Sequence, residues 1–161
     1  MIPDKKYFLA LAGNIGSGKT TLTTIIAEKF GWTPFYESVV NNPYLDDFYK
    51  DMSRWSFHLE VYFLSHRLKA MKKMNEQPGS CVQDRTLDED AEVFSRVLFE
   101  QGSLSKRDYD NYLEYYKYIG DLMKKPDLII YLQTSVDTLL FRIKKRGGRV
   151  NPGLPRNIYS V

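Results

Sequence analysis

The sequence predicts an α/β fold with a mostly parallel sheet. Short apolar runs alternate with segments of helical spacing, and a glycine-rich loop joins the first run to the first helix. With 161 residues and 43% hydrophobic side chains, the chain can bury one sizeable core. We therefore expect a single domain over residues 1–147. An irregular tail rich in glycine and proline is expected over residues 148–161.

Four apolar runs are expected to be strands, over residues 7–12, 32–36, 80–83 and 127–133. Because a helix separates successive strands, the connections are crossovers and the strands lie parallel with helices on both faces. Helices are expected to begin at Lys19 and to span about residues 53–75, 89–101, 108–124 and 135–146. Ser105 stands three residues before Asp108, which is capping-box spacing with Asp in place of the usual Glu or Gln.

Composition excludes several classes of protein. A formal net charge of +3, with basic and acidic residues interspersed, does not indicate a nucleic-acid binder. The single cysteine, Cys81, cannot form an intramolecular disulfide and is expected to be buried. No run approaches the ~18 apolar residues of a membrane span, and the start lacks a leader pattern, so a soluble cytoplasmic protein is expected.

The strongest motif is a Walker A loop between the first strand and the first helix. It consists of Gly13, Asn14, Ile15, Gly16, Ser17, Gly18, Lys19 and Thr20. Glycines let backbone N–H groups approach phosphate oxygens, while the helix N-terminus and the Lys19 ammonium add positive potential. Thr20 places a hydroxyl where it can ligate Mg²⁺. The loop predicts binding of a nucleoside triphosphate without naming the reaction.

Three further sites carry acidic or basic side chains. Glu37 and the pair Asp84–Arg85 follow strands, at the edge of a parallel sheet where ligands bind. Glu37 could accept the proton of an attacking hydroxyl or hold Mg²⁺ through water, although a solvated loop acid is as plausible. Arg85 could neutralise a phosphoryl group in transfer, with Asp84 orienting it or the metal; the alternative is an ion pair that closes a turn.

Glu60 has no cation three or four residues away on its predicted helix. A carboxylate in that apolar setting needs a partner, either a tertiary salt bridge, to Arg85 for example, or a ligand. Arg142 and Arg146 end the last helix, where cations offset the helix dipole; they could instead form a lid over the triphosphate. His58 and His66 lack metal-ligand partners, so Mg²⁺ is the only metal implied.

Together these motifs resemble the deoxynucleoside kinases, particularly the bacterial deoxyadenosine and deoxyguanosine kinases. Five motifs carry the resemblance in order, at residues 37–39, 41–45, 48–49, 55–57 and 84–86. The resemblance covers about residues 7–147. It implies a P-loop kinase fold with five parallel strands, a homodimer, and transfer of the γ-phosphoryl group of ATP, with Mg²⁺, to the 5′-hydroxyl of a deoxynucleoside in nucleotide salvage.

The resemblance also implies roles for individual residues. Glu37 is similar to the general base, and Arg85 to the arginine beside the 5′-hydroxyl. Tyr49 matches the tyrosine that contacts the sugar 3′-hydroxyl, and Trp55 and Asp90 match residues of the base pocket. Arg142 and Arg146 resemble lid arginines.

Two features depart from the family pattern. Glu60 stands where a glutamine usually reads the base. An ionised carboxylate offers only acceptors, which suits the two adjacent donors of guanine. This predicts a preference for deoxyguanosine over deoxycytidine. After Gly147 the family's further helices and fifth strand are not found. We expect a truncated or frame-shifted product in which the strand at residues 127–132 is left as an edge.

Other functions remain as alternatives. A nucleoside monophosphate kinase of the thymidylate type shares the loop and the Asp-Arg motif, but normally has an Arg-Glu-Pro-Gly-like sequence where this chain has residues 36–39. A nucleotide switch would need an Asp-x-x-Gly or Asn-Lys-x-Asp motif, which does not follow the loop. A phosphate-binding remnant that has lost catalysis is the third alternative.

Overall fold

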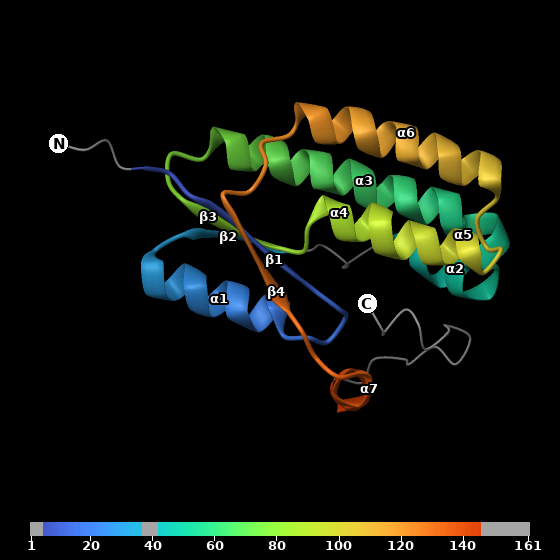
Figure 1. Ribbon diagram of the computed structural model, residues 1–161, viewed down its shortest axis with the longest axis horizontal. Coiled ribbons are helices and arrows are strands. Elements are labelled where there is room, and N and C mark those ends of the chain that lie inside the picture. Colours follow the sequence, from blue (N-terminus) through green and yellow to red (C-terminus); the bar gives the residue numbers. More distant parts are fainter. Residues whose placement is uncertain (1–4, 37–41, 146–161) are drawn as a thin grey trace. The chain divides into compact units, whose positions relative to one another are not determined.

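The computed structural model describes residues 5–36 and 42–145 (Figure 1). They belong to two compact units, and each is described by itself. Of the described residues, the first unit combines 5–36, 77–86 and 126–145, and the second combines 42–76 and 87–125. The expectation of one domain over residues 1–147 stays a prediction, as does the irregular tail, which lies outside the described residues.

The first unit contains a parallel four-stranded sheet. Its strands are β1 (Phe8–Gly13), β2 (Thr33–Phe35), β3 (Cys81–Asp84) and β4 (Leu128–Leu132), in the order β2-β3-β1-β4. All three pairings are parallel, with Phe8 opposite Cys81 and Leu9 opposite Leu128. The expected strands and the α/β fold class are therefore confirmed, with each strand end differing by one residue.

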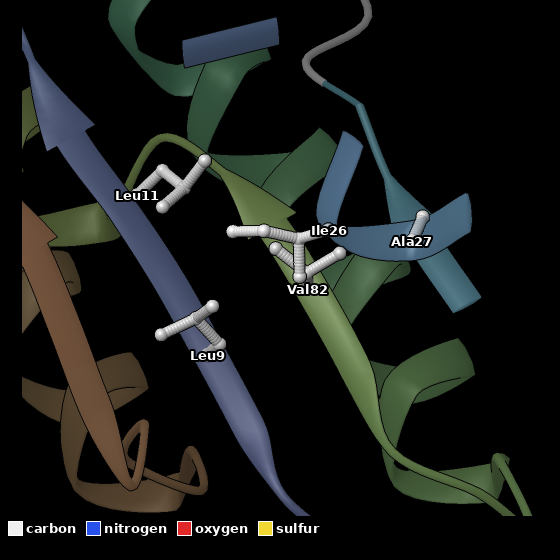
Figure 2. Close-up of a cluster of buried hydrophobic side chains, with 5 residues drawn as sticks. All are labelled: Leu9, Leu11, Ile26, Ala27 and Val82. Atoms are coloured by element: carbon white, nitrogen blue, oxygen red, sulfur yellow. The ribbon is translucent and has the colours of Figure 1, made fainter. Parts of the chain in front are cut away.

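Helix α1 (Lys19–Phe30) covers part of this sheet. Figure 2 shows Ile26 and Ala27 of α1 close to Val82 of β3, with Leu9 and Leu11 of β1 in the same cluster. All five side chains are buried, between 0% and 8% exposed. Because β1 is buried along its whole length, it holds its C-terminal end, where the glycine loop begins, in a fixed position. Helix α7 (Val136–Lys145) follows β4 in the same unit.

Strand β4 has a neighbour on one side only among the described residues. It pairs with β1, and Leu128, Ile129 and Tyr131 are 59%, 49% and 51% exposed. The apolar run suggested an interior strand, whereas in the described part of the chain it stands at the edge of the sheet.

The second unit is helical. It contains α2 (Leu45–Lys50), α3 (Met52–Glu76), α4 (Leu87–Glu89), the π-helical segment η1 (Asp90–Ser95), α5 (Arg96–Glu100) and α6 (Lys106–Leu122). Figure 1 shows α3 and α6 side by side, and they pack against each other through a core that includes Leu64 and Tyr112. The expected capping box is confirmed, since the Ser105 hydroxyl oxygen accepts the backbone N–H of Asp108 at 3.1 Å.

Sequence periodicity did not reveal every helical feature. The helix expected over residues 89–101 consists of three segments, α4, η1 and α5, with a π-helical turn in the middle. Helix α2 was not expected. It ends at Lys50, one residue before Asp51, whose side chain accepts the backbone N–H of Arg54 at 3.1 Å. Within the described parts of the chain, no helix is both long and apolar enough to cross a membrane.

Candidate active site

The phosphate loop leaves β1 and enters α1 as the sequence predicted. At Gly13 the backbone φ is +141°, and a side-chain Cβ placed there would lie 2.7 Å from the Leu132 carbonyl oxygen. Only glycine fits a position with both constraints. Within the loop the backbone N–H of Ser17 donates to the Asn14 carbonyl at 3.0 Å. Gly18 is the N-cap residue of α1 and forms no side-chain cap, which leaves this helix end open to a ligand anion.

The Lys19 ammonium lies inside the loop. Lys19 is 6% exposed and donates to the carbonyl oxygens of Gly13 and Asn14, the latter at 3.0 Å. A buried ammonium without such acceptors would be strongly disfavoured. The charge is therefore concentrated where the loop backbone turns toward α1, as a phosphate-binding lysine requires.

Two oxygen-bearing side chains predicted to serve Mg²⁺ meet in this unit. The Thr20 hydroxyl donates to Asp84 Oδ2 at 2.5 Å, which joins the start of α1 to the end of β3. Mg²⁺ prefers oxygen ligands and usually takes only one or two from protein, with the remainder from phosphates and water. The pair fits that requirement. No cluster of three or more His, Cys, Asp or Glu side chains that could hold a metal occurs among residues 5–36 and 42–145.

Arg85 follows β3 in an unusual backbone conformation. Its φ is +74°, the only positive value for a non-glycine residue in the described ranges, and its N–H donates to the Leu11 carbonyl at 2.9 Å. Left-handed backbone at a non-glycine residue costs free energy and is concentrated at functional sites. Arg85 is 8% exposed. The role expected for Arg85 beside the transferred phosphoryl group stays a prediction.

Arg142 of α7 contacts the phosphate loop directly. Its guanidinium donates to the carbonyl oxygens of Gly16 and Ser17 at 3.2 and 3.0 Å. The guanidinium thus lies beside the loop rather than merely at a helix C-terminus. Arg146, the other arginine expected to belong to a lid, lies outside the described residues, and so does the predicted general base, Glu37.

The base-pocket residues expected from the sequence lie in the second unit, where Glu60 and Asp90 are each 4% exposed. Glu60 Oε2 accepts the hydroxyl of Ser95, and Asp90 Oδ2 lies 2.8 Å from Arg67 Nε. Arg67 was not expected from the sequence to belong to this group. A signal was present, because Arg67 stands seven residues after Glu60 and so lies on the same face of α3 two turns later.

Tyr112 of α6 completes this buried group. Burial raises the pKa of its phenol, and the negative charges of Glu60 and Asp90 raise it further. The phenol therefore stays protonated and neutral. The polar group consists of Glu60, Arg67, Asp90, Ser95 and Tyr112, and we refer to it as the α3–η1–α6 cluster.

Tyr49 and Trp55, expected to contact the nucleoside, are less enclosed. Tyr49 on α2 is 47% exposed, with its ring centroid 5.3 Å from that of Phe48. Trp55 on α3 is partly buried, and its ring lies 5.9 Å from Tyr44 and 5.3 Å from the Arg54 guanidinium. The two side chains belong to the same unit as the α3–η1–α6 cluster.

Comparison with known proteins identifies relatives of this chain. The family model for deoxynucleoside kinases matches residues 9–157. The deoxyadenosine/deoxycytidine kinase of Bacillus subtilis is 39% identical over 145 residues, which are 89% of this chain and 67% of that protein. The deoxyguanosine kinase of the same organism is 39% identical over 140 residues, 87% of this chain and 67% of that protein.

Comparison with solved structures also finds deoxynucleoside kinases. The deoxyadenosine kinase from M. mycoides, with dCMP and dCDP bound, superposes with a TM-score of 0.83 at 31% identity. The superposition covers 95% of this chain and 78% of that one. Because the family model covers most of the chain and the sheet and loop have the family's fold, this chain belongs to the deoxynucleoside kinases, a family of ATP-dependent phosphotransferases.

Proposed function

We propose that this chain transfers the γ-phosphoryl group of ATP to the 5′-hydroxyl of a purine deoxynucleoside, as a step of nucleotide salvage. The observation that carries the transfer reaction is the set of groups gathered in the first unit: the loop with its buried Lys19, the Thr20–Asp84 pair and Arg142. Each is suited to a polyphosphate or its metal. Relatives named for deoxynucleoside kinase activity support the acceptor.

The proposed roles follow from charge and position. Lys19, Arg142 and Arg146 bind the phosphates, and Thr20 and Asp84 would hold Mg²⁺, which would supply positive charge to the transferred group. Arg85 stabilises the phosphoryl group in transfer. Glu37 accepts the proton of the 5′-hydroxyl as its oxygen attacks the γ-phosphorus and the bond to ADP breaks. The roles of Glu37 and Arg146 are proposed from the sequence alone.

Base selection is assigned to the second unit. Glu60 presents acceptor oxygens only, whereas guanine presents two adjacent donors, N1–H and the 2-amino group. We therefore propose deoxyguanosine as the preferred acceptor over deoxycytidine, with Asp90, Tyr49 and Trp55 as further contacts to the nucleoside. Equal or better turnover of deoxycytidine, unchanged in Glu60→Gln, would remove the basis for this preference.

The deciding experiment uses the purified 161-residue protein with ATP, Mg²⁺ and each of the four deoxynucleosides. Deoxynucleoside monophosphate should form, fastest with a purine, and Lys19→Met should abolish turnover while leaving the thermal unfolding midpoint close to that of the unsubstituted chain. Adding thymidine monophosphate as an acceptor tests the thymidylate-kinase alternative. Retained ATP binding without product from any acceptor would instead support a catalytically impaired phosphate-binding remnant.

A homodimer is the proposed assembly. Helix α6 carries Tyr115, Tyr118 and Leu122 on one stripe, and these side chains are 48%, 64% and 82% exposed. Leu122→Lys should shift the chain to monomers in sedimentation velocity. Lys117→Glu, at an exposed position away from the stripe, should not. A wild-type chain that sediments as a monomer at micromolar concentration would contradict the proposal.

A further inference from the structure

The α3–η1–α6 cluster is enclosed by three helical segments of the second unit. Glu60 and Arg67 come from α3, Asp90 and Ser95 from η1, and Tyr112 from α6. All five residues are between 0% and 6% exposed. Buried charges at this density require mutual compensation, so the position of every polar atom in the cluster has energetic consequences.

The π-helical turn determines which residues of η1 meet α3. In an α-helix, residues five apart are separated by about 140° around the axis, because each residue turns about 100°. A π-helical turn has i→i+5 hydrogen bonds, which brings such residues to one side. Asp90 and Ser95 are five apart, and the Ser95 hydroxyl lies 3.0 Å from the Asp90 carbonyl oxygen. The turn therefore presents the Asp90 carboxylate and the Ser95 hydroxyl to α3 together.

Ser95 has one hydrogen to donate. Its acceptors include Glu60 Oε2 and the Asp90 carbonyl oxygen, and the Tyr112 phenol lies beside it. A hydrogen bond to an ionised carboxylate is shorter and stronger than one to a neutral carbonyl. Ser95 can therefore donate its hydrogen to the Glu60 carboxyl group. Ser95 is 0% exposed, so water does not compete for this bond.

We propose that Ser95 is a positioning residue that fixes the Glu60 carboxylate for selection of the nucleobase. This inference rests on the proposed base-reading function of Glu60. A glutamate side chain has three rotatable bonds, and a carboxylate that must meet two donors of one base gains selectivity only when its plane is held. Ser95 acts through Glu60 and makes no contact with substrate in this proposal.

The test compares nucleoside binding and turnover in Ser95→Ala and Ser95→Cys. Cysteine keeps a side chain of similar shape but is a weak donor, so both variants lose the bond to Glu60. The preference for deoxyguanosine over deoxycytidine should fall about tenfold, the order of effect expected when a hydrogen bond to a charged group is lost. The change should lie in Kd and KM for deoxyguanosine, with kcat for deoxycytidine unchanged.

Ser56→Ala is the matched control. Ser56 is also 0% exposed in the same unit, but its hydroxyl donates to the Met52 carbonyl of its own helix at 2.7 Å. Its removal perturbs packing to a similar degree without touching a carboxylate. The ratio of dissociation constants for the two nucleosides should therefore stay within twofold of wild type.

A Glu60→Gln background separates positioning from general destabilisation. If Ser95 acts through Glu60, adding Ser95→Ala to Glu60→Gln should leave the nucleoside ratio unchanged within twofold. The inference would be overturned, with the proposed function intact, by either of two results. One is a ratio of dissociation constants for the two nucleosides that is unchanged in both Ser95 variants. The other is a Ser95→Ala effect on that ratio that is as large in the Glu60→Gln background as in the wild-type chain. The proposed base reading itself fails if Glu60→Gln alone leaves the ratio unchanged. Calorimetric binding gives the ratio even for a variant that does not turn over.

Discussion

Removing the guanidinium of Arg67 should strongly destabilise the second unit. Arg67 Nε and Asp90 Oδ2 lie 2.8 Å apart, and the two side chains are only 7% and 6% exposed. Arg67→Met deletes the positive charge and leaves the Asp90 carboxylate buried beside that of Glu60, since both act on the buried Tyr112 phenol. Breaking a buried ion pair by removing one partner costs about 3–5 kcal/mol.

The thermal unfolding midpoint gives the clearest measurement. For a chain of this length each kcal/mol corresponds to roughly 2–4 °C, so Arg67→Met should lower the midpoint by roughly 6–20 °C. The double variant Arg67→Met/Asp90→Asn removes both charges and should recover more than half of the loss in unfolding free energy, because the destabilising species is the buried Asp90 carboxylate without the Arg67 charge.

Arg96→Met is the control for this prediction. Arg96 Nε also lies 2.8 Å from a carboxylate, that of Glu100, but these side chains are 61% and 51% exposed. The pair is solvated and should contribute nothing measurable to the midpoint. If Arg67→Met lowers the midpoint no more than Arg96→Met, or if the double variant is as unstable as Arg67→Met, the reasoning from burial is wrong.

Three further changes test the phosphate loop and the buried phenol. Gly13→Ala should cost about 1–3 kcal/mol of unfolding free energy and weaken ATP binding, because φ is +141° and the new Cβ would meet the Leu132 carbonyl oxygen. Urea unfolding measures the first effect and nucleotide titration the second. Gly79→Ala, where the new Cβ would meet no atom within 4 Å, is the control. Thr20→Val should raise the Mg²⁺ concentration for half-maximal activity by about tenfold or more, whereas Thr20→Ser should not. Unfolding free energy should fall as pH rises above about 10, because the raised pKa of Tyr112 keeps the phenol protonated in the folded chain while the unfolded chain releases the proton. Tyr112→Phe should reduce this dependence of unfolding free energy on pH, measured by urea titrations at pH 8 and 11.

The phosphate loop was predictable because its chemistry is local. Residues 13–20 follow a buried strand and open a helix, and the glycines, lysine and threonine that serve phosphate are neighbours in the chain. Long helices were predictable for a similar reason: the apolar stripe of α3 repeats over seven turns, so its period stands out clearly.

The contacts of Glu60 were not predictable in the same way. Its isolation from cations at three and four residues was visible in the sequence, and so was the need for a partner. One partner among the described residues is Ser95, thirty-five residues later, and it is brought into register with Asp90 by a π-helical turn. Periodicity indicates that a segment is helical, but it does not distinguish a π-helical turn from the α-helix around it.

By itself, the amino-acid sequence determined the class of fold, the four strands, the longer helices between them and the position of the phosphate loop, since each depends on residues close together in the chain. Only the tertiary structure decided that Arg67 is the counter-charge of Asp90, that Thr20 bonds to Asp84 and that Arg142 lies against the loop. These pairs are separated by 23, 64 and 125 or more residues. Their geometry arises from sheet register and helix packing, which bring distant segments into contact and remove water from the charges that meet there.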